Sequence, residues 1–208
     1  MTAPELTQKR EKCDMFKHSE NRQVLYSLNA LAEALLDLMQ KEGFEEITVT
    51  QICQTAGITR RTFYRNCDSK LDLIDFLTEK YVRNLLDSVD FTCTDALLLY
   101  RNFFQYWKEH STFLRALYQN RLFPWFSRTF TTCCIRWMED GLMLDMLKGR
   151  PNGETLRLFY NSFLIGGLCS VLEPWTAEDF QTSTQELAYV LASLAPERVS
   201  LHFTDVIS

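Results

Sequence analysis

The stretch from Ile47 to Lys70, ITVTQICQTAGITRRTFYRNCDSK, contains the start of two helices and the end of one. Thr48 to Gln51 is a capping box, in which a Thr side chain and a Gln three residues later each satisfy a free backbone donor of the other. Gly57 predicts the end of that helix, because glycine accepts the left-handed conformation that other residues resist. Thr59 is a favourable N-cap for the next helix. The pattern predicts two short helices joined by a tight glycine turn.

The flanking sequence predicts a longer helix on each side of this pair. Apolar residues recur at helical spacing before it, at Leu25, Leu28, Ala32, Leu35 and Met39. Gly43 predicts the end of that first helix. After the pair, Ser69 and Asp72 form a second capping-box-like start. Together these elements predict a helix-turn-helix domain over residues 21–75, preceded by a flexible polar arm over residues 1–20.

The second short helix has the chemistry of a DNA-reading element. A helix-turn-helix places its second helix in the major groove, where an arginine fork can bond guanine O6 and N7 together. Arg60 and Arg61 stand in the first turn of that helix, and nearby hydroxyls and Lys70 suit phosphate oxygens. The predicted DNA-binding residues are Thr48, Thr50, Thr59, Arg60, Arg61, Thr62, Tyr64 and Lys70.

The same stretch resembles the DNA-binding domain of TetR-type regulators. The resemblance rests on Ala56-Gly57-Ile58-Thr59, on Thr62-Phe63-Tyr64, and on Ser69-Lys70 followed by Leu73. It implies a transcriptional regulator, a repressor, that binds a palindromic operator as a homodimer and is released by a small molecule. It also implies an all-helical effector-binding and dimerisation domain over residues 76–208.

Three positions depart from the family pattern. Cys53 replaces a common alanine, and Asn66 and Cys67 stand where an aromatic or histidine and then a phenylalanine are usual. Loss of that phenylalanine is expected to thin the small core beneath the second helix. A helical interaction protein that keeps the fold but has lost specific DNA binding is therefore the alternative function.

The remaining sequence predicts further helices and no strands. Approximate spans are 95–109, 111–119, 122–147, 153–173 and 178–194, with breaks at Pro124, residues 149–153 and Pro174. No window alternates as a strand does, and the whole chain holds only 7 glycines and 5 prolines, too few for a fold rich in turns. The fold class is therefore all-α.

Residues 91–137 hold thirteen aromatic residues, about twice the chain average of 13%. An aromatic-lined cavity between helices would suit a flat or apolar effector, and a simple packed core is the alternative. The predicted pocket comprises Phe103, Phe104, Trp107, Phe123, Trp125, Phe126 and Tyr160.

Two adjacent glycines point to a helix–helix contact. Gly166 and Gly167 fall inside a predicted helix, where each glycine costs about 1 kcal/mol relative to alanine. Close approach of two backbones in a symmetric dimer would explain them, and a kink lining the pocket is the alternative. The predicted interface comprises Phe159, Phe163, Gly166, Gly167, Val171, Leu187, Val190 and Leu191.

Composition restricts the remaining function classes. The net charge is −5, and all of the acidic excess lies after residue 70, so a basic tip sits on an acidic body. No nucleotide loop, hydrolase elbow or zinc-binding motif occurs, which argues against an enzyme, a cofactor and a metal site. No signal peptide or membrane span is predicted, so a cytoplasmic protein is expected. The seven cysteines are irregularly spaced, and Cys133-Cys134 as a redox sensor is the less favoured alternative to buried thiols.

Overall fold

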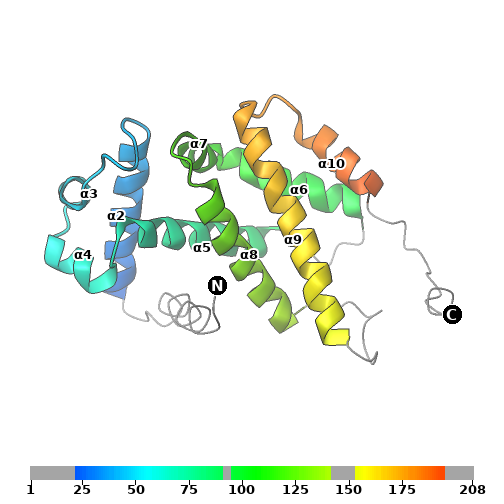
Figure 1. The fold of residues 1–208 in the computed structure, drawn as a ribbon, viewed down its shortest axis with the longest axis horizontal. Helices are drawn as coiled ribbons and strands as arrows, with labels where there is room; N and C mark the ends of the chain where they lie inside the picture. The colour runs from blue at the N-terminus through cyan, green and yellow to red at the C-terminus, as the bar shows by residue number, and fades with distance from the viewer. Residues whose placement is uncertain (1–21, 91–94, 142–152, 195–208) are drawn as a thin grey trace.

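The computed structural model describes residues 22–90, 95–141 and 153–194 (Figure 1), so the predicted arm over residues 1–20 lies outside the described residues. Every regular element in these ranges is a helix, as predicted. The helices are α2 (Arg22–Met39), α3 (Val49–Ala56), α4 (Arg60–Asn66), α5 (Lys70–Ser88), α6 (Ala96–Glu109), α7 (Ser111–Gln119), α8 (Phe123–Gly141), α9 (Gly153–Ala177) and α10 (Thr184–Leu194).

The predicted caps around α3 and α4 are confirmed. The Thr48 hydroxyl accepts from the Gln51 backbone N–H at 3.2 Å, and the Gln51 side chain accepts from the Thr48 N–H at 2.8 Å. Gly57 adopts φ +66°, and the Ile58 N–H bonds the Cys53 carbonyl at 2.9 Å. These local bonds fix where each helix begins and ends, and so set the turn between α3 and α4.

The predicted end of the first helix at Gly43 is wrong. Helix α2 ends at Met39, and the Lys41 N–H bonds the Leu38 carbonyl at 2.8 Å in a turn. The Gly43 carbonyl instead accepts from Glu46 at 3.0 Å, within the loop that leads to α3. Helical spacing of apolar residues therefore marked the buried face of α2 correctly but not its last residue.

Gly57→Ala should lower the free energy of unfolding by about 1–2 kcal/mol, the cost of a left-handed conformation for a residue with a Cβ. The new Cβ would meet no atom within 4 Å, so the backbone conformation alone causes the loss. Gly43→Ala is the matched control, because Gly43 has no positive φ and should gain about 0.5 kcal/mol. Urea titration of both variants measures the difference, and equal stabilities would contradict the assigned turn.

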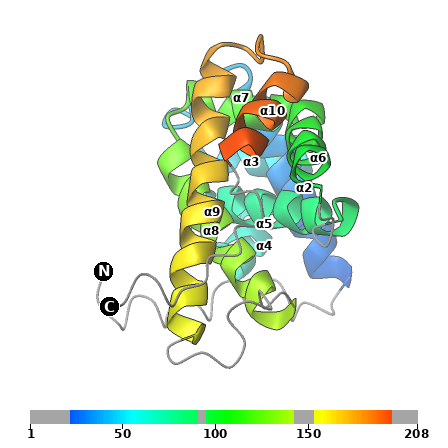
Figure 2. The same cartoon turned by 90° about the vertical axis from the view of Figure 1, so that its right-hand side faces the viewer.

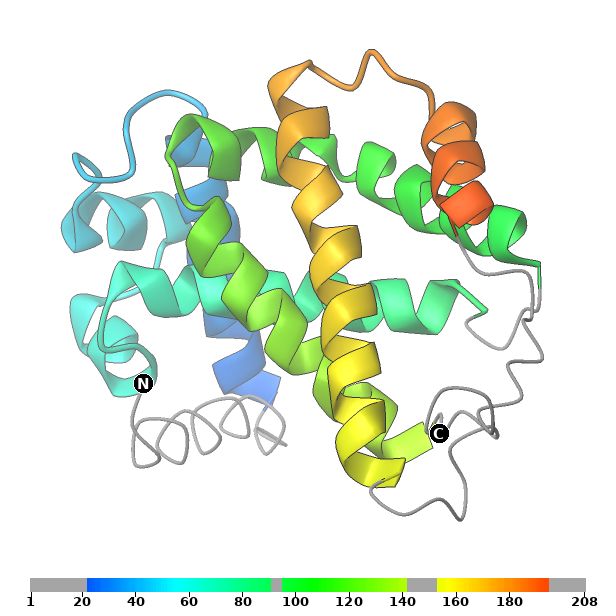
Figure 3. The same cartoon turned by 45° about the vertical axis from the view of Figure 1, so that its right-hand side comes forward.

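Helix α5 connects the two parts of the molecule. Figure 1 shows α2, α3 and α4 at one end and α6, α9 and α10 at the other, with α5 running between them. Helices α8 and α9 lie side by side, and α8 crosses and contacts α5 (Figure 3), while α10 packs against α6. Helix α7 contacts both α2 and α9. The helix-turn-helix end is thus joined to the C-terminal part through α5 and α7.

The C-terminal end of α9 differs from the prediction. The helix passes Pro174 and ends at Ala177, with the Glu178 N–H bonded to the Pro174 carbonyl at 3.1 Å. Asp179 and Phe180 then adopt φ +54° and +60°, which ends the helix. Helix α10 starts at Thr184 rather than residue 178 because Ser183 and Glu186 form another capping box.

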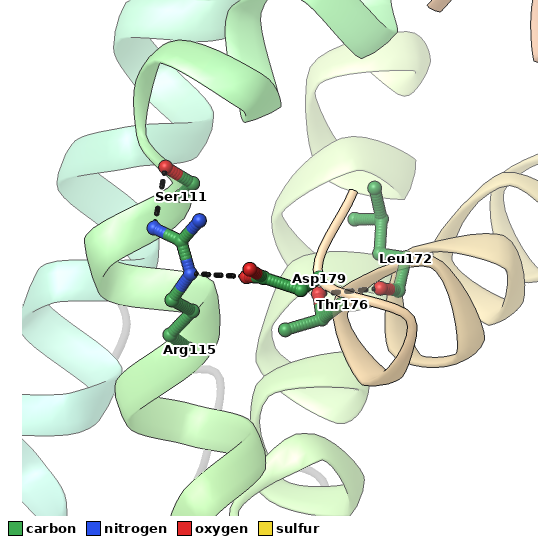
Figure 4. A network of polar contacts seen from close by, with 5 residues as sticks. All are labelled: Ser111, Arg115, Leu172, Thr176 and Asp179. Carbon is green, nitrogen blue, oxygen red and sulfur yellow. Dashed lines mark hydrogen bonds and ion pairs between the residues drawn. The ribbon is translucent and has the colours of Figure 1, made fainter. Parts of the chain in front are cut away.

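A polar network attaches this turn to α7 (Figure 4). The Arg115 Nε lies 2.8 Å from an Asp179 carboxylate oxygen, and its Nη1 donates to the Ser111 hydroxyl at 3.2 Å. The same guanidinium lies 5.0 Å from the centre of the buried Phe180 ring. These contacts fix α7 against the end of α9.

Candidate nucleic-acid interface

Helix α4 presents a basic face to solvent and an apolar face to the core. Arg60, Arg61, Tyr64 and Arg65 are all exposed, and Tyr64 keeps 52% of its surface accessible. Phe63 is fully buried, with its ring edge-on to Tyr64 at 5.2 Å. The Arg60 guanidinium lies 5.9 Å from the centre of the Tyr64 ring, so the two side chains share one exposed surface. Exposed arginines in the first turn of such a helix have the fork geometry that can bond base edges.

The predicted threonines divide into capping and open groups. Thr59 caps α4 by accepting from the Thr62 N–H at 3.2 Å, and their hydroxyls lie 3.0 Å apart. Thr48 caps α3, as described above. Thr50 is exposed in the first turn of α3. The capping hydroxyls thus already hold the helix starts, which orients the exposed arginines.

Lys70 lies at the same end of the domain but points into it. Its ammonium donates to the backbone carbonyls of Phe44, Glu45 and Ile47, the last two at 3.1 Å. It also lies 4.4 Å from the centre of the Phe44 ring. The structure therefore places the predicted phosphate contact against the α2–α3 loop, apart from the exposed face of α4.

The two residues that replace the usual aromatic pair lie at the end of α4. Cys67 is buried and its N–H bonds the Phe63 carbonyl at 2.8 Å, while Cys53 is buried on α3. The Asn66 Nδ2 is buried and has no hydrogen-bond partner among the described residues. Burial without a partner costs about 1–3 kcal/mol, so this corner is a local weak point.

Comparison with known proteins identifies both parts of the chain. Residues 31–76 match the family described as "Bacterial regulatory proteins, tetR family", and residues 96–196 match "Transcriptional regulator C-terminal region" of the TetR type. The chain belongs to the TetR family of transcriptional regulators. Proteins of this family are non-enzymatic regulators that bind DNA and dimerise.

Individual relatives of this TetR-family chain match it over a short stretch or at low sequence identity. The HTH-type dhaKLM operon transcriptional activator DhaS of Lactococcus lactis subsp. lactis (strain IL1403) is 35% identical over 57 residues, which are 27% of this chain and 30% of that protein. The solved structure of the dihydroxyacetone kinase operon activator DhaS has a TM-score of 0.50 at 19% identity, over 81% of this chain and 93% of that one. The TetR family repressor AlkX from Dietzia sp. strain DQ12-45-1b has a TM-score of 0.48 at 16% identity, over 79% and 90% of the two chains.

Five of the predicted effector-pocket rings of this TetR-family protein lie in the buried core, in two groups of contacting rings that together are called the aromatic cluster. Phe103, Phe104, Trp107, Phe123 and Phe126 are all buried. Trp107 packs against Phe126 at 5.5 Å, and Phe104 packs against Trp175 of α9 at the same separation. Phe103 and Phe104 form one group with Trp175, and Trp107, Phe123 and Phe126 form a second, with edge-to-face contacts inside each group. In the described residues both groups belong to the core of the C-terminal part.

Trp125 is half-buried against the same core and makes a different contact. Its indole N–H donates to the Asp75 carboxylate of α5 at 2.8 Å, and the Thr129 hydroxyl donates to the same oxygen. The Arg128 guanidinium lies 4.1 Å from the Trp125 ring centre on the same side of α8. Trp125 therefore joins α8 to α5, a role that the sequence analysis missed. The side chain of Tyr160 lies outside the described residues.

The predicted dimer residues divide between exposed and half-buried positions. Phe163 is 81% exposed, Phe159 66% and Val190 54%. A Cβ added to Gly166 or Gly167 would meet no atom within 4 Å, so both glycines have open space beside them among the described residues. Val171, Leu187 and Leu191 are half-buried and pack on the core. Leu158, Tyr189 and Leu194 are exposed as well.

The described cysteine thiols are buried or half-buried. Burial raises the pKa of the Cys169 thiol to about 11 and also raises the pKa of the Cys134 thiol, so both are neutral and poorly nucleophilic. Cys133 is half-buried. Within the described ranges, no three acidic, His or Cys side chains form a group that could hold a metal ion. No helix in those ranges is long and apolar enough to cross a membrane.

Proposed function

We propose that this TetR-family chain is a homodimeric regulator whose α4 helices bind a near-palindromic operator. A small apolar or aromatic effector held in the C-terminal part would change that binding. The observation that carries the proposal is the exposed face formed by Arg60, Arg61 and Tyr64 on α4. This helix is capped by Thr59, and its buried Phe63 packs into the core. In helix-turn-helix dimers, the two recognition helices bind half-sites about 34 Å apart, which is one turn of DNA.

Exposed apolar residues on α9 and α10 support the homodimer. Both helices face the viewer in Figure 2. Aromatic side chains as exposed as Phe159, Phe163 and Tyr189 are costly in water and typical of an uncovered protein interface. A second copy of the chain fits this surface because helix-pair interfaces in symmetric dimers use the same patch twice. The open space beside Gly166 and Gly167 would admit the partner's backbone.

Phe163→Glu should convert the dimer to a monomer, since the charge would be buried without a partner in each copy of the interface. Sedimentation equilibrium measures the mass directly. Tyr26→Glu is the matched control, because Tyr26 is 71% exposed on α2, distant in the fold from α9, and this variant should remain dimeric. A wild-type monomer, or a dimer unaffected by Phe163→Glu, would contradict the proposed interface.

The aromatic cluster supports an apolar or aromatic effector. The indole N–H of Trp107 is fully buried and has no hydrogen-bond partner among the described residues, and neither does the buried Asn161 Oδ1. Such atoms favour a ligand that carries a polar group on an apolar body. The effector would act only through different affinities for the DNA-bound and free shapes of the dimer. Screening an aromatic compound panel against operator binding tests this part, and no change with any compound would contradict it.

The direction of regulation is proposed to be repression, as the family resemblance implies, although the relative named DhaS is an activator. A promoter–reporter fusion carrying the selected operator tests the direction. Reporter output should fall when the protein is expressed, and a rise would assign an activator.

An interaction protein without specific DNA binding is the second candidate function. The buried Asn66 Nδ2, which has no hydrogen-bond partner among the described residues, and the small Cys67 favour it, because both weaken the support of α4. DNA binding that is sequence-selective and weakens as salt rises would exclude this candidate, since that salt dependence reports phosphate contacts.

A further inference from the structure

The ammonium of Lys70, a half-buried residue, is hydrogen-bonded by one loop. It donates to three carbonyls of residues 44–47 and lies over the Phe44 ring at 4.4 Å. A lysine ammonium has three N–H donors, so these carbonyls account for all of them. To bond a DNA phosphate directly, Lys70 would have to release at least one loop carbonyl. In this position Lys70 holds the three loop carbonyls together.

The same loop is held from the C-terminal part by Asn120. This residue ends α7, and its Oδ1 accepts from the Phe44 N–H while its Nδ2 donates to the Ala116 carbonyl at 2.8 Å. Phe44 therefore has its N–H bound by one half of the molecule and its carbonyl bound by the other. The side chains of Phe44 and Ile47 are buried as well, at 4% and 1% exposure.

The clamped loop leads directly into the DNA-binding helices. Ile47 precedes Thr48, the N-cap of α3, and the Gln51 amide donates back across the loop to Glu42 at 3.2 Å. Any displacement of residues 44–47 would move the start of α3 and, through the glycine turn, α4. The loop is thus placed to set the height and tilt of the exposed arginine face.

We propose that Lys70 is a positioning residue for DNA recognition, and that Asn120 is a second anchor of the same loop supplied by the C-terminal part. Lys70 holds the α2–α3 loop and makes no phosphate contact. The proposal rests on the proposed DNA-binding function, and it also gives the C-terminal part a direct hold on the residues that precede α3.

Salt dependence separates the two roles of Lys70. Each phosphate contact contributes about 0.9 to the slope of log affinity against log salt concentration. If Lys70 is a positioning residue, Lys70→Met should weaken operator affinity about tenfold, the loss expected for charge-assisted hydrogen bonds, with an unchanged slope. If Lys70 instead contacts a phosphate, Lys70→Met should make the slope less steep by about one for each protomer.

Lys70→Arg and Asn120→Ala extend the test. A planar guanidinium replaces a lysine well at a phosphate but does not match three converging carbonyls, so Lys70→Arg should also bind the operator several-fold more weakly. Asn120→Ala should weaken binding about threefold with the slope kept, and its effect should not add fully to that of Lys70→Met. Gln119→Ala is the matched control, because Gln119 is exposed beside Asn120, and it should bind normally.

Fluorescence anisotropy with a selected operator, across a range of salt concentrations and below the melting temperature of every variant, gives these values. A lysine that only stabilises the fold would shift the melting temperature and leave the affinity of the folded dimer unchanged, which would overturn the proposal. A less steep salt dependence of operator affinity in Lys70→Met, or wild-type operator affinity in Lys70→Arg, would also overturn it. Failure of the wild-type protein to bind any DNA would instead overturn the proposed function, and the positioning role with it.

Discussion

Phe63→Ala should lower the free energy of unfolding of the helix-turn-helix end by about 3–5 kcal/mol, the usual cost of removing a buried phenylalanine ring. Phe63 is fully buried, and it is the one residue of α4 that is buried as a whole. The core around it is already thin, because Cys67 stands in place of a phenylalanine. The variant should therefore lose operator binding through loss of structure in α3 and α4, while the α9 and α10 surface remains intact.

Denaturant unfolding and amide hydrogen exchange measure this effect by region. Protection should fall in residues 49–66 and persist in α9. Tyr64→Ala is the control on the same helix, since its half-exposed ring contributes much less to stability but belongs to the proposed DNA surface. It should change stability by less than about 1 kcal/mol and still weaken DNA binding. A Phe63→Ala variant as stable as wild type would contradict the assigned core.

Asp75→Ala should have the second largest effect, a loss of about 3 kcal/mol in the free energy of unfolding. One carboxylate oxygen of Asp75 accepts from both Trp125 and Thr129 of α8. Removing it leaves two donors of another helix without that acceptor, at about 1–3 kcal/mol each. Because these bonds join α5 to α8, the variant should also unfold in two steps, with the helix-turn-helix end separating from the C-terminal part.

Differential scanning calorimetry distinguishes one transition from two. Asp75→Asn keeps an acceptor oxygen and should lose only about 1 kcal/mol. Asp87→Ala removes an exposed carboxylate from the same helix and should change stability by no more than about 0.5 kcal/mol. A single transition and unchanged stability in Asp75→Ala would show that α5 and α8 are held by apolar packing alone.

The helix-turn-helix end was predictable because its signals are local. Thr48 with Gln51, Gly57 and Thr59 each act within a few residues, and all of them appear in the structure as predicted. Ser183 with Glu186 carries the same kind of signal for α10 and went unused in the sequence analysis. The predicted end of α2 was wrong because the helix ends in a turn of ordinary residues, without a glycine cap.

Contacts between segments far apart in the chain could not be predicted from the sequence. Lys70 bonds carbonyls about 25 residues earlier in the chain, and backbone carbonyls carry no residue-specific signal. The pairing of Trp125 with Asp75 and of Asn120 with Phe44 depends on how α7 and α8 pack on the other helices. The composition of residues 91–137 marked an aromatic region, but only the fold shows that five of the predicted pocket rings are buried and that Trp125 serves a different contact.

Selection of bound fragments from a random DNA pool at moderate salt tests the central claim most directly, with Arg60→Ala and Tyr64→Ala selected in parallel. The proposed function predicts enrichment of an inverted repeat by the wild-type dimer. Arg60→Ala should relax one base position in each half-site, and Tyr64→Ala should weaken binding evenly across sequences. No enrichment by the wild-type dimer, with and without the aromatic compound panel, would contradict DNA recognition through α4.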